Sequence, residues 1–186
     1  MIPQPQTYPL SVEAYHRMRE TGILKPDDRV ELIRGQIVPM SPKGSKHSNT
    51  VNRISKVLTL ALDGIAEVHN QNPIHLEDHS EPEPDLALLI PPLSRYDERL
   101  PIPEDVLLVI EVADSSLTQD RRSKGLLYAQ AGIAEYWIVN LPAREVEVYQ
   151  QPLENGYKVC TRYQRSEMIP VAELGVELPV GEMLME

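Results

Sequence analysis

The chain has 186 residues, of which 41% are hydrophobic, and a formal net charge of −10 at pH 7. This length fits one domain with a sizeable core, and we expect residues 1–186 to form a single domain. The only cysteine, Cys160, excludes an internal disulfide and a cysteine zinc site. The negative charge argues against tight binding of nucleic acid by overall charge, because that binding needs Lys and Arg to neutralise phosphates.

The first half of the chain predicts a hairpin and then a helix. Residues 30–40 have apolar and β-branched residues on both sides of Gly35 and Gln36, which is typical of a β-hairpin. Between residues 45 and 65, apolar residues recur at helical spacing, and Gly64 can end that helix. No apolar stretch reaches the roughly 20 residues of a membrane helix, and the first residues lack signal-peptide features. We therefore expect a cytoplasmic protein.

The second half predicts a sheet. Strands are expected at residues 67–76, 85–90 and 106–112, and a helix from Ser115 to Ala131, where Gly132 provides the stop. A further strand is expected at 135–140, a half-exposed alternating strand at 145–149, and edge strands from Tyr157 to Tyr163 onward. This order predicts a mixed α/β domain with a sheet between helices.

Glu111 is the most informative residue of the chain. It lies inside Val106–Ala113, a run that otherwise has the composition of a fully buried strand. Burying an isolated carboxylate is costly, so an ionised group there needs a metal, a cation or a proton. Asp85 directly precedes another apolar run, Leu86–Ile90, and Lys124 lies on the next predicted helix.

These three side chains predict a catalytic site if the two strands are neighbours. Asp85 and Glu111 then hold Mg²⁺ or Mn²⁺, hard cations that prefer oxygen ligands, and the backbone carbonyl of Val112 is a further expected ligand. Lys124 then stabilises charge on a phosphate or orients the attacking water. The chemistry that this arrangement favours is phosphodiester hydrolysis.

Each residue also has a structural interpretation. Asp85 alone fits a solvated carboxylate at a strand entrance, and Glu111 fits a buried ion pair with an arginine or lysine. Lys124 alone fits an exposed helix lysine paired with Asp120 four residues earlier. The conjunction of the three is what favours a functional site.

Several segments resemble the PD-(D/E)XK restriction-endonuclease-like superfamily, and in particular its Uma2 family of endonucleases. The likeness covers nearly the whole chain and is carried by Pro84–Asp85 and the segments Val30–Gly35, Met40–His47, Glu111–Ser116, Asp120–Tyr128 and Gly132–Val139. The resemblance implies a central mixed β-sheet flanked by α-helices, with extra N- and C-terminal β-hairpins. It also implies Asp85 and Glu111 as metal ligands. Ala113 stands where the superfamily usually has lysine, and the resemblance implies that Lys124 replaces it.

Four further residues are weaker candidates for the site. Glu31 is expected near the metal, or else as an exposed strand acid. His47 is expected to contact phosphate or the acidic cluster, or else to pack at the helix terminus. Gln71 is expected to line the pocket from the strand before Asp85, with an ordinary strand polar residue as the alternative. Tyr128, one turn after Lys124, either covers the site or packs in the core.

The leading hypothesis is a Mg²⁺- or Mn²⁺-dependent endonuclease that acts on nucleic acid, with DNA as the expected substrate. A basic rim would offset the acidic charge around the site and would consist of Arg34, Arg121, Arg122 and Lys124. The alternative is a catalytically inactive structural or interaction protein with the nuclease fold. A third hypothesis is hydrolysis of another phosphate ester. We also expect a homodimer, because endonuclease-like domains that cut both strands often pair and strand 145–149 offers a surface.

Overall fold

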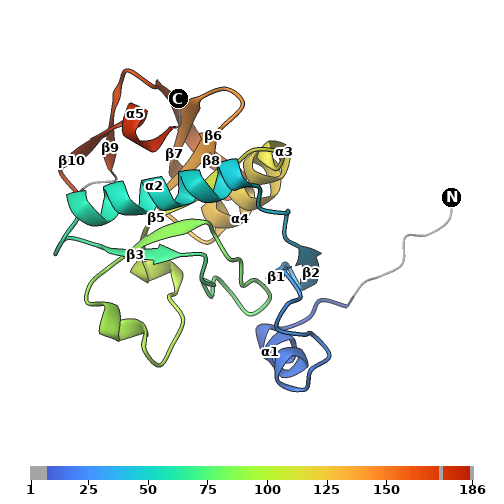
Figure 1. The fold of residues 1–186 in the computed structure, drawn as a ribbon. Helices are drawn as coiled ribbons and strands as arrows, with labels where there is room; N and C mark the ends of the chain where they lie inside the picture. Colours follow the sequence, from blue (N-terminus) through green and yellow to red (C-terminus); the bar gives the residue numbers. More distant parts are fainter. Residues whose placement is uncertain (1–7, 172–173, 185–186) are drawn as a thin grey trace, which may run out of the picture.

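The computed structural model of the protein describes residues 8–171 and 174–184, which form an α/β fold around a six-stranded mixed sheet (Figure 1). The strand order is β3-β4-β5-β6-β7-β8, and only β5 and β6 are parallel. The strands of this sheet are β3 (Glu67–Asn70), β4 (Leu86–Leu89), β5 (Val106–Ala113), β6 (Glu135–Asn140), β7 (Glu145–Leu153) and β8 (Gly156–Gln164). The central mixed sheet with flanking helices confirms the predicted fold class.

The remaining elements surround this sheet. The helical segments are α1 (Val12–Glu20), α2 (Ser45–Ala61), η1 (Leu93–Tyr96), η2 (Pro103–Asp105), α3 (Leu117–Gln119), η3 (Asp120–Lys124), α4 (Gly125–Gln130) and α5 (Val180–Met183). Two separate antiparallel hairpins are β1 (Val30–Ile33) with β2 (Gln36–Pro39), and β9 (Met168–Val171) with β10 (Val176–Pro179). Both hairpins agree with the prediction of extra hairpins near the two ends.

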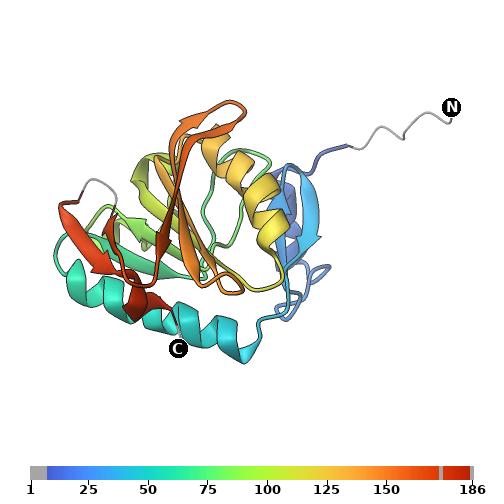
Figure 2. The same ribbon diagram turned by 90° about the horizontal axis from the view of Figure 1, so that it is seen from above.

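Helices cover both faces of the sheet, and α2 and the α3–η3–α4 segment lie on opposite sides (Figure 2). The apolar side of α2 packs on one face, where Ile54 and Leu58 belong to the same buried cluster as Leu88. On the other face, Leu127 and Tyr128 of α4 pack into a second cluster. Successive strand residues point to opposite faces, and this alternation decides which side chains of β5 meet which helix.

The helix expected from Ser115 to Ala131 contains a π-helical turn, η3. The backbone N–H of Gly125 donates to the carbonyl of Asp120, five residues earlier. Such turns are rare and occur mostly inside α-helices, often at functional sites. Both ends of this turn, Asp120 and Lys124, are buried.

Two predicted strands differ from the structure. The strand expected at 67–76 ends at Asn70, because Gln71 adopts a left-handed backbone conformation with φ of 50° that no strand continues through. The strand at 145–149 is not half-exposed: Glu147 is 0% exposed, since Arg121 of η3 covers it and donates hydrogen bonds to its carboxylate. The first long helix ends at Ala61, three residues before Gly64.

The 145–149 strand also offers no free edge, because β7 is paired on both sides by β6 and β8. It is therefore closed to edge pairing with a second copy, and the homodimer stays a prediction. None of the helices in the described ranges is long and apolar enough to cross a membrane.

Candidate active site

Asp85 and Glu111 meet at the junction of β4 and β5. The two strands are antiparallel, with Leu86 paired to Ile110, so the next step of the register places Asp85 opposite Glu111. The backbone N–H of Asp85 donates to Glu111 Oε2 at 3.4 Å. The two residues are 6% and 4% exposed, respectively. The neighbouring-strand arrangement expected for these two acids is present.

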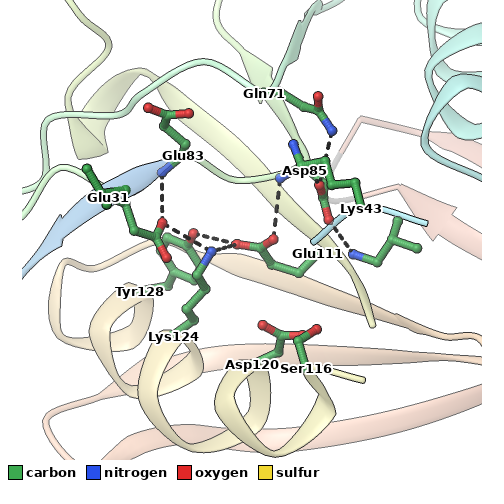
Figure 3. A network of polar contacts seen from close by, with 12 residues as sticks. Glu31, Lys43, Gln71, Glu83, Asp85, Glu111, Ser116, Asp120, Lys124 and Tyr128 are labelled. Carbon is green, nitrogen blue, oxygen red and sulfur yellow. Dashed lines mark hydrogen bonds and ion pairs between the residues drawn. The ribbon is translucent and has the colours of Figure 1, made fainter. Parts of the chain in front are cut away.

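Lys124 reaches Glu111 from η3, on the side of the sheet that carries α4 (Figure 3). Its ammonium group is 2.9 Å from Glu111 Oε1 and 3.3 Å from a carboxylate oxygen of Glu31, which comes from β1. The Tyr128 hydroxyl donates to the same Glu111 oxygen at 2.9 Å. Two side chains from consecutive elements, Lys124 of η3 and Tyr128 of α4, therefore hold one oxygen of Glu111, while its other oxygen faces Asp85.

Asp85 is held by a different set of donors. Its Oδ2 lies 2.9 Å from His47 Nε2, near the start of α2, and accepts the backbone N–H of Val112 at 3.0 Å. Its Oδ1 accepts the side-chain amide of Gln71 at 3.3 Å and lies 3.9 Å from the Lys43 ammonium group. Figure 3 shows Gln71 and Lys43 converging on Asp85.

The two central carboxylates have opposite pKa shifts. Burial raises the pKa of Glu111 to about 8 against the opposing effect of Lys124, and the charges of nearby carboxylates, foremost Asp85, add to the increase. Burial also acts to raise the pKa of Asp85, but the hydrogen bond and charge of His47, with the Val112 N–H, outweigh it and lower that pKa. The site therefore holds one firmly ionised carboxylate beside one that binds a proton more readily.

Lys124 is a permanent positive charge in this site. Burial lowers its pKa, but the attraction of Glu111 and Glu31 is stronger and raises the pKa overall. This raised pKa requires an ionised Glu111, whereas the raised pKa of Glu111 favours its protonated form. Glu111 is ionised beside Lys124, because a 2.9 Å contact between an ammonium group and a carboxylate is the geometry of two charged groups.

A small cavity of about 70 Å³ opens between these residues. Its lining includes three acidic residues that were not predicted for the site, namely Glu83, Asp114 and Asp120. Burial raises the pKa of both Glu83 and Asp120, and each also lies in the field of Glu31. Lys43 also lines this cavity and was missed, because a lysine between Pro42 and Gly44 gives no periodic signal. Negative groups therefore outnumber the lysines around the cavity.

This donor set fits a hard divalent cation. Within residues 8–171 and 174–184, no group of three His, Cys, Asp or Glu side chains is arranged to hold a metal ion. Mg²⁺, however, is usually bound by only one or two carboxylates and keeps several waters. Asp85 and Glu111 supply that pair. Val112 lines the cavity while its side chain belongs to the α2-side core, so its backbone faces the cavity.

The positions of Lys124, Glu31 and Asp85 contradict the structural interpretation of each of these residues. Lys124 is 8% exposed, so it is neither an exposed lysine nor part of a basic rim. Glu31 is 2% exposed, so it is not an exposed strand acid. Asp85 is not a freely solvated carboxylate. The interpretation of Glu111 as half of a buried ion pair agrees with its contact to Lys124.

The fold and this site define an α/β domain of the restriction-endonuclease-like class, with paired acids on adjacent strands. A family model described as "Uma2: Putative restriction endonuclease" matches residues 12–181, and the chain belongs to the Uma2 family.

A solved structure titled "Crystal structure of a putative nuclease belonging to DUF820 from Anabaena variabilis ATCC 29413" is similar in fold. The TM-score is 0.73 at 18% sequence identity, over 94% of this chain and 97% of that chain. At this identity the likeness shows the fold alone. No curated protein matches the chain.

Proposed function

We propose that this protein is a divalent-metal-dependent endonuclease whose residues 1–186 act as one domain. The observation that carries the proposal is the pairing of Asp85 with Glu111 across β4 and β5, with the Lys124 ammonium group 2.9 Å from Glu111. Membership of the Uma2 family supports hydrolysis of nucleic acid as the reaction class.

Asp85, Glu111 and the Val112 carbonyl are the groups proposed to hold Mg²⁺ or Mn²⁺. A bound cation of this kind supplies Lewis-acid polarisation of a phosphoryl oxygen and a more acidic water. In the reaction, a water oxygen forms a bond to phosphorus and releases a proton to the surrounding water, the opposite phosphorus–oxygen ester bond breaks, and the leaving oxygen takes up a proton from that water. Asp85 is suited to a lasting ligand role, because its lowered pKa keeps it ionised.

Lys124 is proposed to stabilise negative charge on the phosphate. Its raised pKa makes it a poor base, so it acts through its charge rather than by removing a proton from water. His47 and Gln71 hold Asp85 by hydrogen bonds, and Tyr128 and Glu31 hold Glu111 and Lys124. We assign these four residues a positioning role.

Incubation of the purified protein with plasmid DNA, linear duplexes and RNA tests this proposal. We expect cuts with millimolar Mg²⁺ or Mn²⁺, none with EDTA, and none from the Asp85→Ala or Glu111→Ala variants. Asp97→Ala is the matched control, because it removes an exposed carboxylate that does not line the cavity. Equal cutting by Asp85→Ala and wild type would refute the assignment of the site.

A second candidate function is an inactive nuclease-fold protein that binds a partner. The observation in its favour is that Lys124 is buried between two carboxylates while Ala113 occupies the usual lysine position of the superfamily. Thermal unfolding separates the two candidates. A cation that binds the folded state raises the unfolding temperature, so unchanged unfolding of wild type in millimolar Mn²⁺ favours the inactive protein.

Two finer points complete the proposal. DNA is the proposed substrate. Cleavage of RNA or of a simple phosphodiester, but not of DNA, would mean that the protein hydrolyses another phosphate ester. A homodimer is proposed only because cutting both strands of a duplex suits paired sites. A monomeric mass by light scattering, with and without duplex DNA, would refute the dimer.

A further inference from the structure

Positive charge is concentrated in one segment of this acidic protein. Residues 32–62 contain no Asp or Glu, although the whole chain has 28 acidic residues. The same segment contains the basic residues Arg34, Lys43, Lys46, Arg53 and Lys56. Most of this segment is α2 and the loop before it. A local basic surface therefore exists within a chain whose net charge is −10.

Three of these cations form one exposed face of α2, which we call the α2 basic face: Lys46, Arg53 and Lys56. Spacings of seven and three residues place them on the same side of a helix. The opposite side of α2, with Val51, Ile54 and Leu58, is buried against the sheet. Within the described part of the chain, the three residues of the face form no ion pair and no side-chain hydrogen bond.

The α2 basic face begins beside the candidate active site. Helix α2 starts at Ser45, and His47 in its first turn contacts Asp85. Lys43, just before the helix, lines the cavity and lies 3.9 Å from Asp85 Oδ1. Ten residues separate Lys46 from Lys56, about 15 Å along a helix. That length corresponds to about four nucleotide steps of a duplex strand.

A groove of about 810 Å³ lies at the far end of this face. Three cations, Arg53, Lys56 and Arg165, line this groove with one acid, Glu182. Its apolar lining includes Leu60, which is 72% exposed. A surplus of cationic over acidic side chains, beside apolar ones, suits the phosphates and sugars of an extended polyanion.

We propose that the α2 basic face binds the phosphate backbone of a nucleic acid whose scissile bond lies at Asp85 and Glu111. The position of the cut rests on the proposed nuclease function. The path of the strand rests on two observations: the cations of the α2 basic face are unpaired, and the face leads to Lys43 at the cavity. It resolves the conflict between an acidic chain and a polyanionic substrate, because Lys46, Arg53 and Lys56 lie on residues 32–62, the longest segment of the chain that carries no acid. The contacts are to phosphates, so they confer affinity without sequence preference.

Binding of a fluorescein-labelled DNA duplex, followed by anisotropy in EDTA so that no cleavage occurs, tests this proposal. The variant is Arg53→Gln with Lys56→Gln. Each lost phosphate contact reduces the slope of log affinity against log salt by about 0.9, so we expect a slope smaller by about 2 between about 50 and about 200 mM salt. The matched control is Lys158→Gln with Arg162→Gln, which removes two charges from exposed residues of β8 that do not line the cavity.

The outcomes are distinguishable from those of the nuclease test. The proposal is overturned if Arg53→Gln with Lys56→Gln leaves the slope and the affinity unchanged, or if the β8 control variant loses as much. Absence of duplex binding by wild type at low salt, or binding of phosphatidylserine vesicles in place of the duplex, also overturns it. If wild type cuts nothing but binds the duplex through Arg53 and Lys56, the role of the α2 basic face stands and the nuclease proposal fails. Asp85→Ala is expected to retain duplex binding.

Discussion

Lys124 and Glu111 form a buried ion pair that joins the π-helical turn η3 to the middle of the sheet. The ammonium group is 2.9 Å from Glu111 Oε1, and both residues are less than 10% exposed. Glu31, 3.3 Å from the same ammonium group, places a second carboxylate beside it. The lysine therefore compensates two buried acids in addition to its proposed role toward phosphate.

Replacing Lys124 by methionine should reduce both stability and activity. Removing one partner of a buried ion pair leaves uncompensated charge and typically costs about 3–5 kcal/mol. Urea denaturation should show that loss for Lys124→Met. The double variant Lys124→Met with Glu111→Gln should regain much of the stability but no cleavage. A Lys124→Met variant as stable as wild type would show that the pair does not compensate the two acids.

The pairing of Asp85 with Glu111 was predictable, because it follows from local pattern. Two apolar runs mark the strands, and their order along the chain makes them neighbours. The helical period of residues 45–65 likewise predicted α2, with His47 near its start, and left contact with the acids as one of two alternatives for His47. The helix depends on the period within one element, and the pairing depends on two strands that follow one another along the chain.

The burial of Lys124 and of Glu147 was not predictable in this way. Lys124 is buried because a π-helical turn and Glu31 from a distant hairpin bring two carboxylates around it. Glu147 alternates with Val146 and Val148 as an exposed residue would, but Arg121 of η3 covers it. In both cases a partner comes from an element that does not follow directly along the chain, Glu31 of β1 for Lys124 and Arg121 of η3 for Glu147, and no local period encodes that contact.

Replacing His47 by glutamine should weaken metal binding more than it weakens the fold. His47 Nε2 lies 2.9 Å from Asp85 Oδ2 and helps to lower the pKa of that carboxyl. Loss of a residue that orients a metal ligand commonly costs about 10–100-fold in metal affinity. Titration with Mn²⁺ followed by calorimetry measures this change. His16→Gln is the control, because His16 contacts Glu81 instead, and its variant should bind Mn²⁺ as wild type does.

Helix α2 offers a matched pair of core and surface substitutions. Ile54 is 0% exposed within the cluster that joins α2 to the sheet, whereas Leu60 on the same helix is 72% exposed. Ile54→Ala should lower the free energy of unfolding by about 2–5 kcal/mol, because it deletes buried methyl groups and leaves a cavity. Leu60→Ala should change it by less than about 0.5 kcal/mol. Equal losses in urea denaturation would contradict the packing of α2 described above.

Glu147 gives the structure a pH-dependent contact away from the cavity. Arg121 donates two hydrogen bonds to its carboxylate, and Tyr149 and Asn140 donate others. Burial acts to raise the pKa of Glu147, but these donors, with Arg121 first, outweigh it and lower the pKa below its ordinary value of 4.5. Because the unfolded chain then takes up the proton first, this contribution to stability is complete above pH 4.5 and is lost as the pH falls below it.

Arg121→Gln should therefore make the free energy of unfolding fall less steeply as the pH decreases below 4.5. Without the guanidinium, the pKa of Glu147 in the folded state moves back toward or above that of the unfolded chain, and less stability remains to be lost below pH 4.5. Urea denaturation at pH 7 and at several values below 4.5 measures the effect. Arg17→Gln serves as the control, because Arg17 forms an exposed pair with Glu13 on α1 that contributes little at any pH. A fall as steep in Arg121→Gln as in wild type would show that other carboxylates cause the acid sensitivity.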